Sequence, residues 1–155
     1  MEICFNAVCW VVDAERPSAG FRHLPHTSDI YIEAYGRSLE EAFEQAGLAL
    51  FRTIVPVAEG VERWVEVVAE AHDLQGLLYE WLEKLLHVFE LDNLVGTVVK
   101  VRRLTVGEVC RVEGFVGGVE FNRAIHQTGT AVKSPTYAFM EIDTANNAVR
   151  FVLDI

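Results

Sequence analysis

The sequence has few of the features that mark secreted or membrane-bound proteins. Its three cysteines, Cys4, Cys9 and Cys110, cannot all pair and form no C-x-x-C motif, which argues against a disulfide framework or a zinc ribbon and predicts reduced thiols. No apolar run approaches the roughly 20 residues that a transmembrane helix needs. The basic start of a secretory signal is also missing, since Glu2 directly follows Met1. These absences predict a cytoplasmic protein that has no membrane partner.

Basic residues are outnumbered by acidic ones. The chain has 13 lysines and arginines against 23 aspartates and glutamates, and its formal net charge is -10. A surface with this balance repels a phosphate backbone, so we expect no direct nucleic-acid binding. A bound cation, or a protein partner with a basic surface, agrees better with the charge.

The signatures of several catalytic classes are absent. There is no G-x-S-x-G turn, which positions the serine nucleophile of many hydrolases, and the glycine-rich stretch 114–118 lacks the Lys-Ser/Thr pair of a phosphate-binding loop. His23, His26 and Asp29 follow one another at three-residue steps, as some zinc ligands do. In an extended chain, however, such steps alternate between two faces, so the three side chains converge only if a turn intervenes. The pattern therefore does not favour zinc.

Length and composition predict one folded domain with a short extension before it. A chain of 155 residues, of which 51% are hydrophobic, is long enough to bury a sizeable core. The Arg-Pro-Ser-Ala-Gly stretch at 16–20 is typical of a linker. We therefore predict that residues 1–20 are an N-terminal extension, either a tail or a weak edge strand, and that residues 21–155 form the domain.

Local signals within the domain predict two helices and several strands. Ser38 and Glu41 form a capping box before a helix over residues 39–52. Asp73 is the predicted N-cap of a second helix, whose apolar residues recur at i+3 and i+4 as far as Phe89. Strand patterns occupy 21–24, 29–35, 61–71, 96–105, 108–115, 131–142 and 148–154, and turn residues stand at Gly107, Gly117-Gly118, Gly129 and Asn146-Asn147. Short turns favour antiparallel pairing, so we predict an α+β fold with two helices packed on one face of a mostly antiparallel sheet.

Two carboxylates stand where predicted strands begin and end. Asp29 starts the strand 29–35, and Asp154 follows the last strand pattern. Carboxylates that meet at strand ends suit a hard cation such as calcium or magnesium, which prefers oxygen ligands, and Ile155 would add a main-chain carbonyl or a terminal carboxylate. The alternative is structural: Asp29 would cap a turn through the amides of Thr27 or Ser28, and Asp154 would be solvated. The residues alone leave both interpretations open.

Four sequence blocks, in order along the chain, resemble the archease family. They are His26-Thr27-Ser28-Asp29 with Ala34-Tyr35-Gly36 and Ser38-Leu39-Glu40-Glu41-Ala42-Phe43, then the helical segment 77–86, then His126 with Lys133 and Thr136-Tyr137, and finally Leu153-Asp154-Ile155. The similarity extends from Phe21 to Ile155. Each block alone is short, but four blocks in the family's order make the resemblance specific.

This resemblance implies an archease-like fold and a function. Archeases are not themselves known as enzymes. They assist an RtcB-type RNA ligase, which joins tRNA halves during tRNA splicing, by promoting guanylylation of the ligase and its repeated turnover. The family binds a metal ion, often calcium, and the resemblance implies Asp29, Asp154 and Ile155 as the metal ligands in this sequence. Magnesium and manganese are the alternatives.

The resemblance also concerns three further polar residues. His26, His126 and Lys133 are implied as contacts of the partner or of the metal ligands, although a purely structural role for each stays open. Many family members have a histidine where this chain has Ala138, so no imidazole role can be assigned there. Pro135 interrupts the same predicted strand and indicates an edge or a bulge.

Two other functions stay open on the sequence alone. A stand-alone metal-dependent enzyme could use Asp29, Asp154 and His26, and it would turn over a small substrate without any ligase. A homo-oligomeric binding module could assemble through an exposed strand edge, and light scattering over a concentration series would reveal it.

Overall fold

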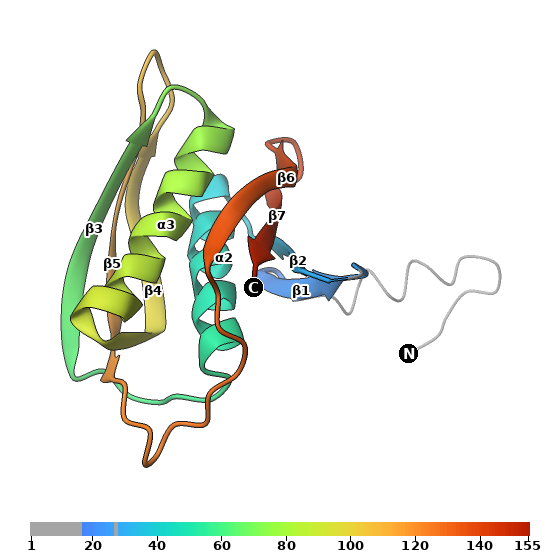
Figure 1. Ribbon diagram of the computed structural model, residues 1–155. Helices are drawn as coiled ribbons and strands as arrows, with labels where there is room; N and C mark the ends of the chain where they lie inside the picture. Colours follow the sequence, from blue (N-terminus) through green and yellow to red (C-terminus); the bar gives the residue numbers. More distant parts are fainter. Residues whose placement is uncertain (1–16, 27) are drawn as a thin grey trace, which may run out of the picture.

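The computed structural model describes residues 17–26 and 28–155, which form seven strands and two helices. In chain order these elements are β1 (Gly20–Leu24), β2 (Ile30–Tyr35), α2 (Leu39–Ile54), β3 (Arg63–Ala71), α3 (Leu74–Asp92), β4 (Leu94–Thr105), β5 (Cys110–Glu120), β6 (Ser134–Asp143) and β7 (Ala148–Asp154). The strands pair antiparallel in two sheets (Figure 1): β1-β2-β7-β6, which we call sheet A, and β3-β5-β4, which we call sheet B. The predicted α+β class, with two helices and antiparallel strands, is confirmed.

The two helices lie between the two sheets, so each sheet has one face covered by helices (Figure 1). α2 packs against β2 and β4, and α3 packs against β3 and β6. The sequence predicted one sheet, whereas the strands divide into two. The reason is the width of the apolar surface on α2, where nine of 16 residues are buried. Such a helix is apolar over more than one stripe and needs a covering layer on two sides.

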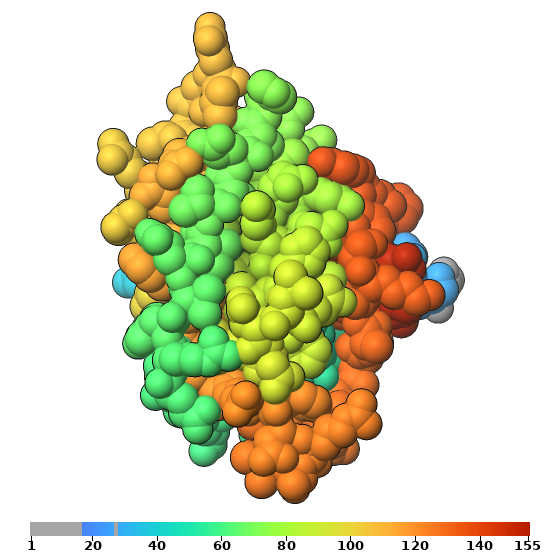
Figure 2. All heavy atoms as spheres, turned by 60° about the vertical axis from the view of Figure 1, so that its left-hand side comes forward, coloured from blue at the N-terminus to red at the C-terminus, as the bar shows by residue number. Residues whose placement is uncertain are grey.

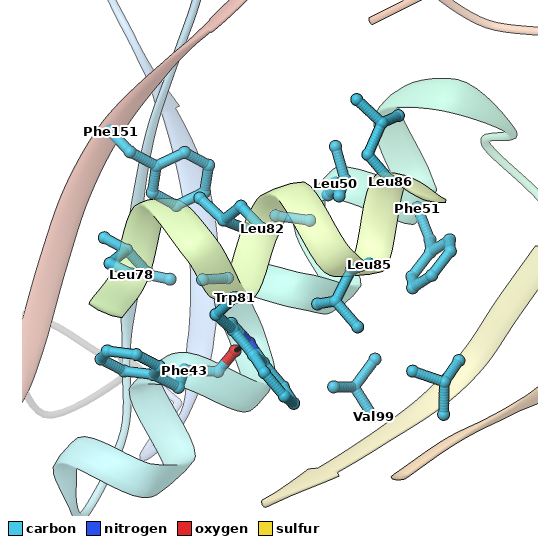
Figure 3. Close-up of a cluster of buried hydrophobic side chains, with 14 of the residues drawn as sticks. Phe43, Leu50, Phe51, Leu78, Trp81, Leu82, Leu85, Leu86, Val99 and Phe151 are labelled. Carbon is cyan, nitrogen blue, oxygen red and sulfur yellow. Dashed lines mark hydrogen bonds between the residues drawn. The ribbon is translucent and has the colours of Figure 1, made fainter. Parts of the chain in front are cut away.

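The helices meet at the centre of the hydrophobic core. Trp81 of α3 is fully buried, and its indole N–H donates to the main-chain oxygen of Phe43 in α2 over 3.0 Å. Leu85 and Val99 pack closely on Gly47, where an added Cβ would lie only 2.6 Å from Cδ1 of Leu85. Figure 3 shows the side chains of Trp81 and Leu85 on α3 close to that of Val99, which comes from β4. The core therefore joins the two layers through the helices.

Both predicted helix starts are confirmed. Oγ of Ser38 accepts the amide N–H of Glu41 at 3.1 Å, and Oδ1 of Asp73 accepts the amide N–H of Gly76 at 2.7 Å. The second hydrogen bond of the predicted capping box, from the amide of Ser38 to the Glu41 side chain, is replaced by another. The carboxylate of Glu41 accepts the amide N–H of Arg37 instead of that of Ser38, and it also pairs with the Arg37 guanidinium.

The predicted turn at Gly117-Gly118 is wrong, because both residues lie within β5. An added Cβ at Gly118 would lie 2.0 Å from the carbonyl oxygen of Val95, and one at Gly117 would lie 2.8 Å from the ring of Trp64. The two glycines therefore allow close packing inside sheet B and do not reverse the chain. The predicted hairpin turns between β4 and β5 and between β6 and β7 are confirmed.

Most of the predicted extension lies outside the described residues. Pro17 is the first residue that the structure describes, and β1 already starts at Gly20, the last residue of the predicted extension. This strand lies at an edge of sheet A. In the part of the chain that the structure describes, neither helix is both long and apolar enough to span a bilayer.

Candidate metal centre

The two predicted carboxylate ligands lie at adjacent ends of the two central strands of sheet A. β2 and β7 pair antiparallel, with Ile30 opposite Leu153. Continued by one residue, this register places Asp29 opposite Asp154, and directly opposite residues have Cβ atoms about 4.5–5.5 Å apart. Both aspartates are half-buried. The fold therefore brings together two carboxylates that are distant in the sequence.

Strand alternation determines the face on which Asp154 lies. Ile32 and Leu153 are fully buried in the core beside the helices. Because successive side chains of a strand point to opposite faces, Asp154 shares its face with Val152. Asp154 thus lies on the outer face of sheet A, the face turned away from α2 and α3, and Asp29 lies in the bend that directly precedes β2.

Three other predicted residues lie at the same end of sheet A. The amide N–H of Lys133 donates to the carbonyl oxygen of Asp154 over 2.7 Å, and Ile155 directly follows Asp154 in the chain. The amide N–H of Asp29 donates to Nδ1 of His26 over 3.3 Å, so the His26 ring is folded back over the start of β2. The structure therefore gathers both aspartates, Ile155, His26 and Lys133.

His126 does not belong to this group. It lies in the segment between β5 and β6, where its Nδ1 accepts the amide N–H of Asn122 at 3.0 Å. Its ring stacks on Phe121 with a centroid separation of 5.9 Å, and only 8% of the residue is exposed. These contacts give His126 a structural role in ordering that segment.

The chemistry of the carboxylate pair fits a hard divalent cation. Like charges directly opposite each other on a sheet are destabilising, and within residues 17–26 and 28–155 neither Asp29 nor Asp154 forms an ion pair. A cation that prefers oxygen ligands would offset this repulsion. The described residues contain no cluster of three or more His, Cys, Asp and Glu side chains that could hold a metal. With Ile155 as a main-chain ligand, the remaining coordination positions would fall to water or a partner.

A row of alternating charges crosses the same outer face. The register places Glu33 between Arg22 of β1 and Arg150 of β7, and Arg150 opposite Glu141 of β6. Glu33 is only 5% exposed, and it accepts hydrogen bonds from Nε of Arg22 at 2.8 Å and Nε of Arg150 at 3.0 Å. Burial opposes ionisation of Glu33, but the two arginines outweigh it and hold the pKa of this carboxyl below its ordinary value. The sequence alone did not indicate the partners of Glu33, because they belong to other strands.

An aromatic cluster of His26, Tyr31 and Phe139 lies beside the carboxylate pair. The centroids of the three rings are 5.7 to 6.0 Å apart. Val152, which lies opposite Tyr31, is 1% exposed although it faces away from the helices. The cluster therefore covers Val152, and it links the ring of His26 to β6.

Phe139 reaches this cluster because β6 contains a bulge. The pairing of β6 with β7 shifts register between Thr136 and Glu141, so residues 137–140 lie opposite a single residue of β7. Phe139 has a φ of 53°, in the left-handed region that disfavours side chains with a Cβ. Pro135 predicted an edge or a bulge in this strand. Both are present, since β6 also forms an edge of sheet A.

Comparison with known proteins agrees with these features. Residues 21–155 match the model of the archease protein family (MTH1598/TM1083). The chain belongs to the archease family. It is 38% identical to protein archease of Aeropyrum pernix over 141 residues, which are 88% of this chain and 97% of that protein. It is 40% identical to protein archease of Sulfolobus acidocaldarius over 139 residues, which are 87% of this chain and 98% of that protein.

Solved structures show the same archease fold. The solution structure of protein 1598 from Methanobacterium thermoautotrophicum superposes with a TM-score of 0.67 at 26% identity, over 88% of this chain and 99% of that one. The crystal structure of an archease and possible chaperone from Thermotoga maritima gives a TM-score of 0.51 at 18% identity, over 86% of this chain and 94% of that one. At the latter identity the likeness concerns the fold alone. The arrangement of two sheets around two helices is therefore the family's architecture.

Proposed function

We propose that this archease family member is a metal-binding accessory protein, not an enzyme, that activates an RtcB-type RNA ligase in tRNA splicing and RNA repair. It would do so by promoting guanylylation of the ligase and its multiple turnover. The observation that carries the proposal is the pairing of Ile30 with Leu153, because Asp29 and Asp154 directly adjoin these two residues at one end of sheet A. Membership in the archease family supports the accessory role. The proposed place of action is the cytoplasm.

The residues at this end of sheet A have distinct proposed tasks. Asp29 and Asp154 would hold the cation, with the main-chain oxygen of Ile155 as a further ligand. When bound, the cation supplies positive charge for a nucleotide phosphate at the ligase. Calcium is the proposed ion, because it tolerates irregular sets of oxygen ligands, whereas magnesium demands near-octahedral geometry. Lys133 is exposed beside Asp154, so its ammonium group can contact the ligase or the phosphate.

Two mechanisms follow from this arrangement. The carboxylate pair could deliver or reposition a metal ion at the nucleotide site of the ligase, or it could hold the ligase in a guanylylation-ready state. In both, the end of sheet A that carries Asp29 and Asp154 must approach the ligase. The net charge of -10 would steer the protein toward the basic RNA-binding surface of a ligase, and this steering weakens with salt.

The test adds the protein to a cognate RtcB-type ligase and measures ligase guanylylation and RNA joining separately. We expect stimulation by the wild type and its loss in Asp29→Asn and Asp154→Asn. Glu108→Gln, which removes an exposed carboxylate in the β4–β5 turn, is the matched control and should stimulate normally. No stimulation by the wild type, or full stimulation by both aspartate variants with folding intact, would refute the proposal. Turnover of a small substrate by the protein alone would instead support a metal-dependent enzyme.

A further inference from the structure

The bulge of β6 turns two large aromatic side chains outward at an edge of sheet A. Tyr137 is 56% exposed and Phe139 is 64% exposed. Exposed aromatic residues lose the benefit of burial, and the left-handed backbone of Phe139 adds a conformational cost. Gln75 of α3 holds the bulge in place, since its Nε2 donates to the main-chain oxygen of Met140 over 3.3 Å. A bulge that is anchored and yet unfavourable in itself is typical of a segment that presents side chains to a partner.

Tyr137 forms a flat aromatic surface together with α3. Its ring stacks on that of Tyr79 with centroids 4.6 Å apart and planes 6° apart. In Figure 2, the atoms of β6 border those of α3 on one face of the molecule. The other face of the Tyr137 ring is therefore available to stack on a planar group of a partner.

Several carboxylates surround the stacked pair. Burial raises the pKa of both tyrosines; Glu83 and Glu80 raise that of Tyr79 further, and Glu80 and Asp73 raise that of Tyr137 further. Lys84 and His87 line a groove against β3, and Nε2 of His87 lies 3.9 Å from Oε1 of Glu83, so Glu83 already faces a basic side chain, whereas Glu80 has no such neighbour among the ion pairs of the described residues. An aromatic surface with carboxylates at its rim suits a guanidinium group, which stacks on the ring and pairs with the carboxylates.

Phe139 connects this surface to the candidate metal centre. Its ring contacts His26, and His26 in turn accepts the amide N–H of Asp29. A protein docked on the bulge would therefore lie next to the carboxylate pair.

We propose that Tyr79, Tyr137 and Phe139 form a docking surface for a protein partner, whose arginine side chains stack on Tyr137 and pair with Glu80. The excess of 10 negative charges over the whole chain complements such a basic partner. The identity of this partner as the RtcB-type ligase rests on the proposed function. The surface itself is assigned from the bulge, the stacking and the carboxylates.

The test measures equilibrium binding of the cognate ligase to immobilised variants, with thermal unfolding as a check of folding. We expect Tyr137→Ala to weaken binding at least about tenfold, as for an aromatic interface anchor, and Phe139→Gly to weaken it as well. Trp64→Ala is the matched control, because Trp64 is 54% exposed on sheet B. Its binding should match that of the wild type.

A charge reversal tests the role of the carboxylate rim. Glu80→Lys should weaken binding more than Glu120→Lys, which changes the net charge equally at the C-terminal end of β5, opposite Leu94. If folded Tyr137→Ala binds the ligase as tightly as the wild type does, the docking surface is wrong and the proposed function stays intact. Absence of any wild-type binding would refute the ligase as partner. Self-association that Tyr137→Ala abolishes would show that the surface binds a second copy instead.

Discussion

Nε of Arg150 lies 3.0 Å from Oε2 of Glu33, so the strand that carries Asp154 also holds a buried carboxylate of the neighbouring strand β2. Nε of Arg22 occupies the other carboxylate oxygen at 2.8 Å. The three strands β1, β2 and β7 are thereby held in one register on the outer face of sheet A. The same register places Asp29 opposite Asp154, so the charged row supports the candidate metal centre.

Replacing Glu33 by glutamine should destabilise the protein by about 2 kcal/mol. The change keeps the size of the side chain, but it replaces charge-assisted hydrogen bonds and removes the negative charge that Arg22 and Arg150 share. Denaturant unfolding at neutral pH measures this loss. Glu141→Gln is the control, since Glu141 is 3.6 Å from Arg150 with a side chain that is 63% exposed, and it should cost less than about 0.5 kcal/mol. Equal losses in the two variants would contradict the central role of Glu33.

The contribution of Glu33 should depend on pH in a defined direction. Its pKa is lower in the folded protein than the ordinary value of 4.5. The ionised carboxylate therefore contributes stability that is fully present above the unfolded pKa and is lost as the pH falls through the folded pKa. We expect the stability difference between wild type and Glu33→Gln to shrink as the pH is lowered below 4.5. Urea unfolding at a series of pH values checks this, and a constant difference would disprove it.

Calcium should stabilise the wild-type protein and not the variant Asp154→Asn. A ligand at a hundredfold excess over its Kd adds about 2.7 kcal/mol to the free energy of unfolding. In the presence of a chelator, Asp154→Asn should instead be more stable than the wild type, because the variant removes the repulsion between residue 154 and Asp29. Thermal unfolding with calcium and with chelator measures both effects, and Glu108→Gln should behave like the wild type. A calcium effect that persists in Asp154→Asn would place the ion elsewhere.

Phe139→Gly should be more stable than Phe139→Ala by about 1 kcal/mol. Both variants lose the ring, but glycine adopts the φ of 53° at this position without the penalty that alanine pays. Tyr137 provides the control pair, because its φ is not positive. There the alanine variant should be the more stable one. The same order at both positions would argue against the left-handed backbone at Phe139.

Gly118→Ala should be among the most destabilising single substitutions in sheet B. Its added Cβ would lie 2.0 Å from the main-chain oxygen of Val95, which cannot move without disturbing the pairing of β4 with β5. We expect a loss of about 4 kcal/mol or more. Gly107→Ala should change stability little, because its added Cβ would lie 3.9 Å from the nearest atom, the main-chain oxygen of Val109. Chemical denaturation of the two variants compares them directly.

Local signals made the helices predictable. Ser38 and Asp73 cap α2 and α3 as their sequence contexts indicate, because a cap depends on residues within one turn. The roles of Gly117 and Gly118 were not predictable in this way. A glycine that reverses the chain and a glycine that admits a neighbouring strand look the same in the sequence, and only the pairing of distant strands distinguishes them.

The candidate site was predictable only in part. The positions of Asp29 and Asp154 at strand ends were visible in the sequence, but their facing register depends on which strands become neighbours. The pairing of Glu33 with two arginines and the aromatic bulge at 137–140 depend on three or more strands. His126 was singled out through the family resemblance, whereas its contacts with Phe121 and Asn122 are structural.

The order of strands in sheet A has a consequence for protein synthesis. The segment Leu39–Glu120 contains both helices and all of sheet B, so this half can pack as soon as it has left the ribosome. Sheet A cannot, because β7 lies between β2 and β6 and is the last strand to be translated. Until then β2 lacks one neighbour, and one side of the helices is uncovered. We therefore expect nascent chains stalled before residue 148 to need protection from aggregation.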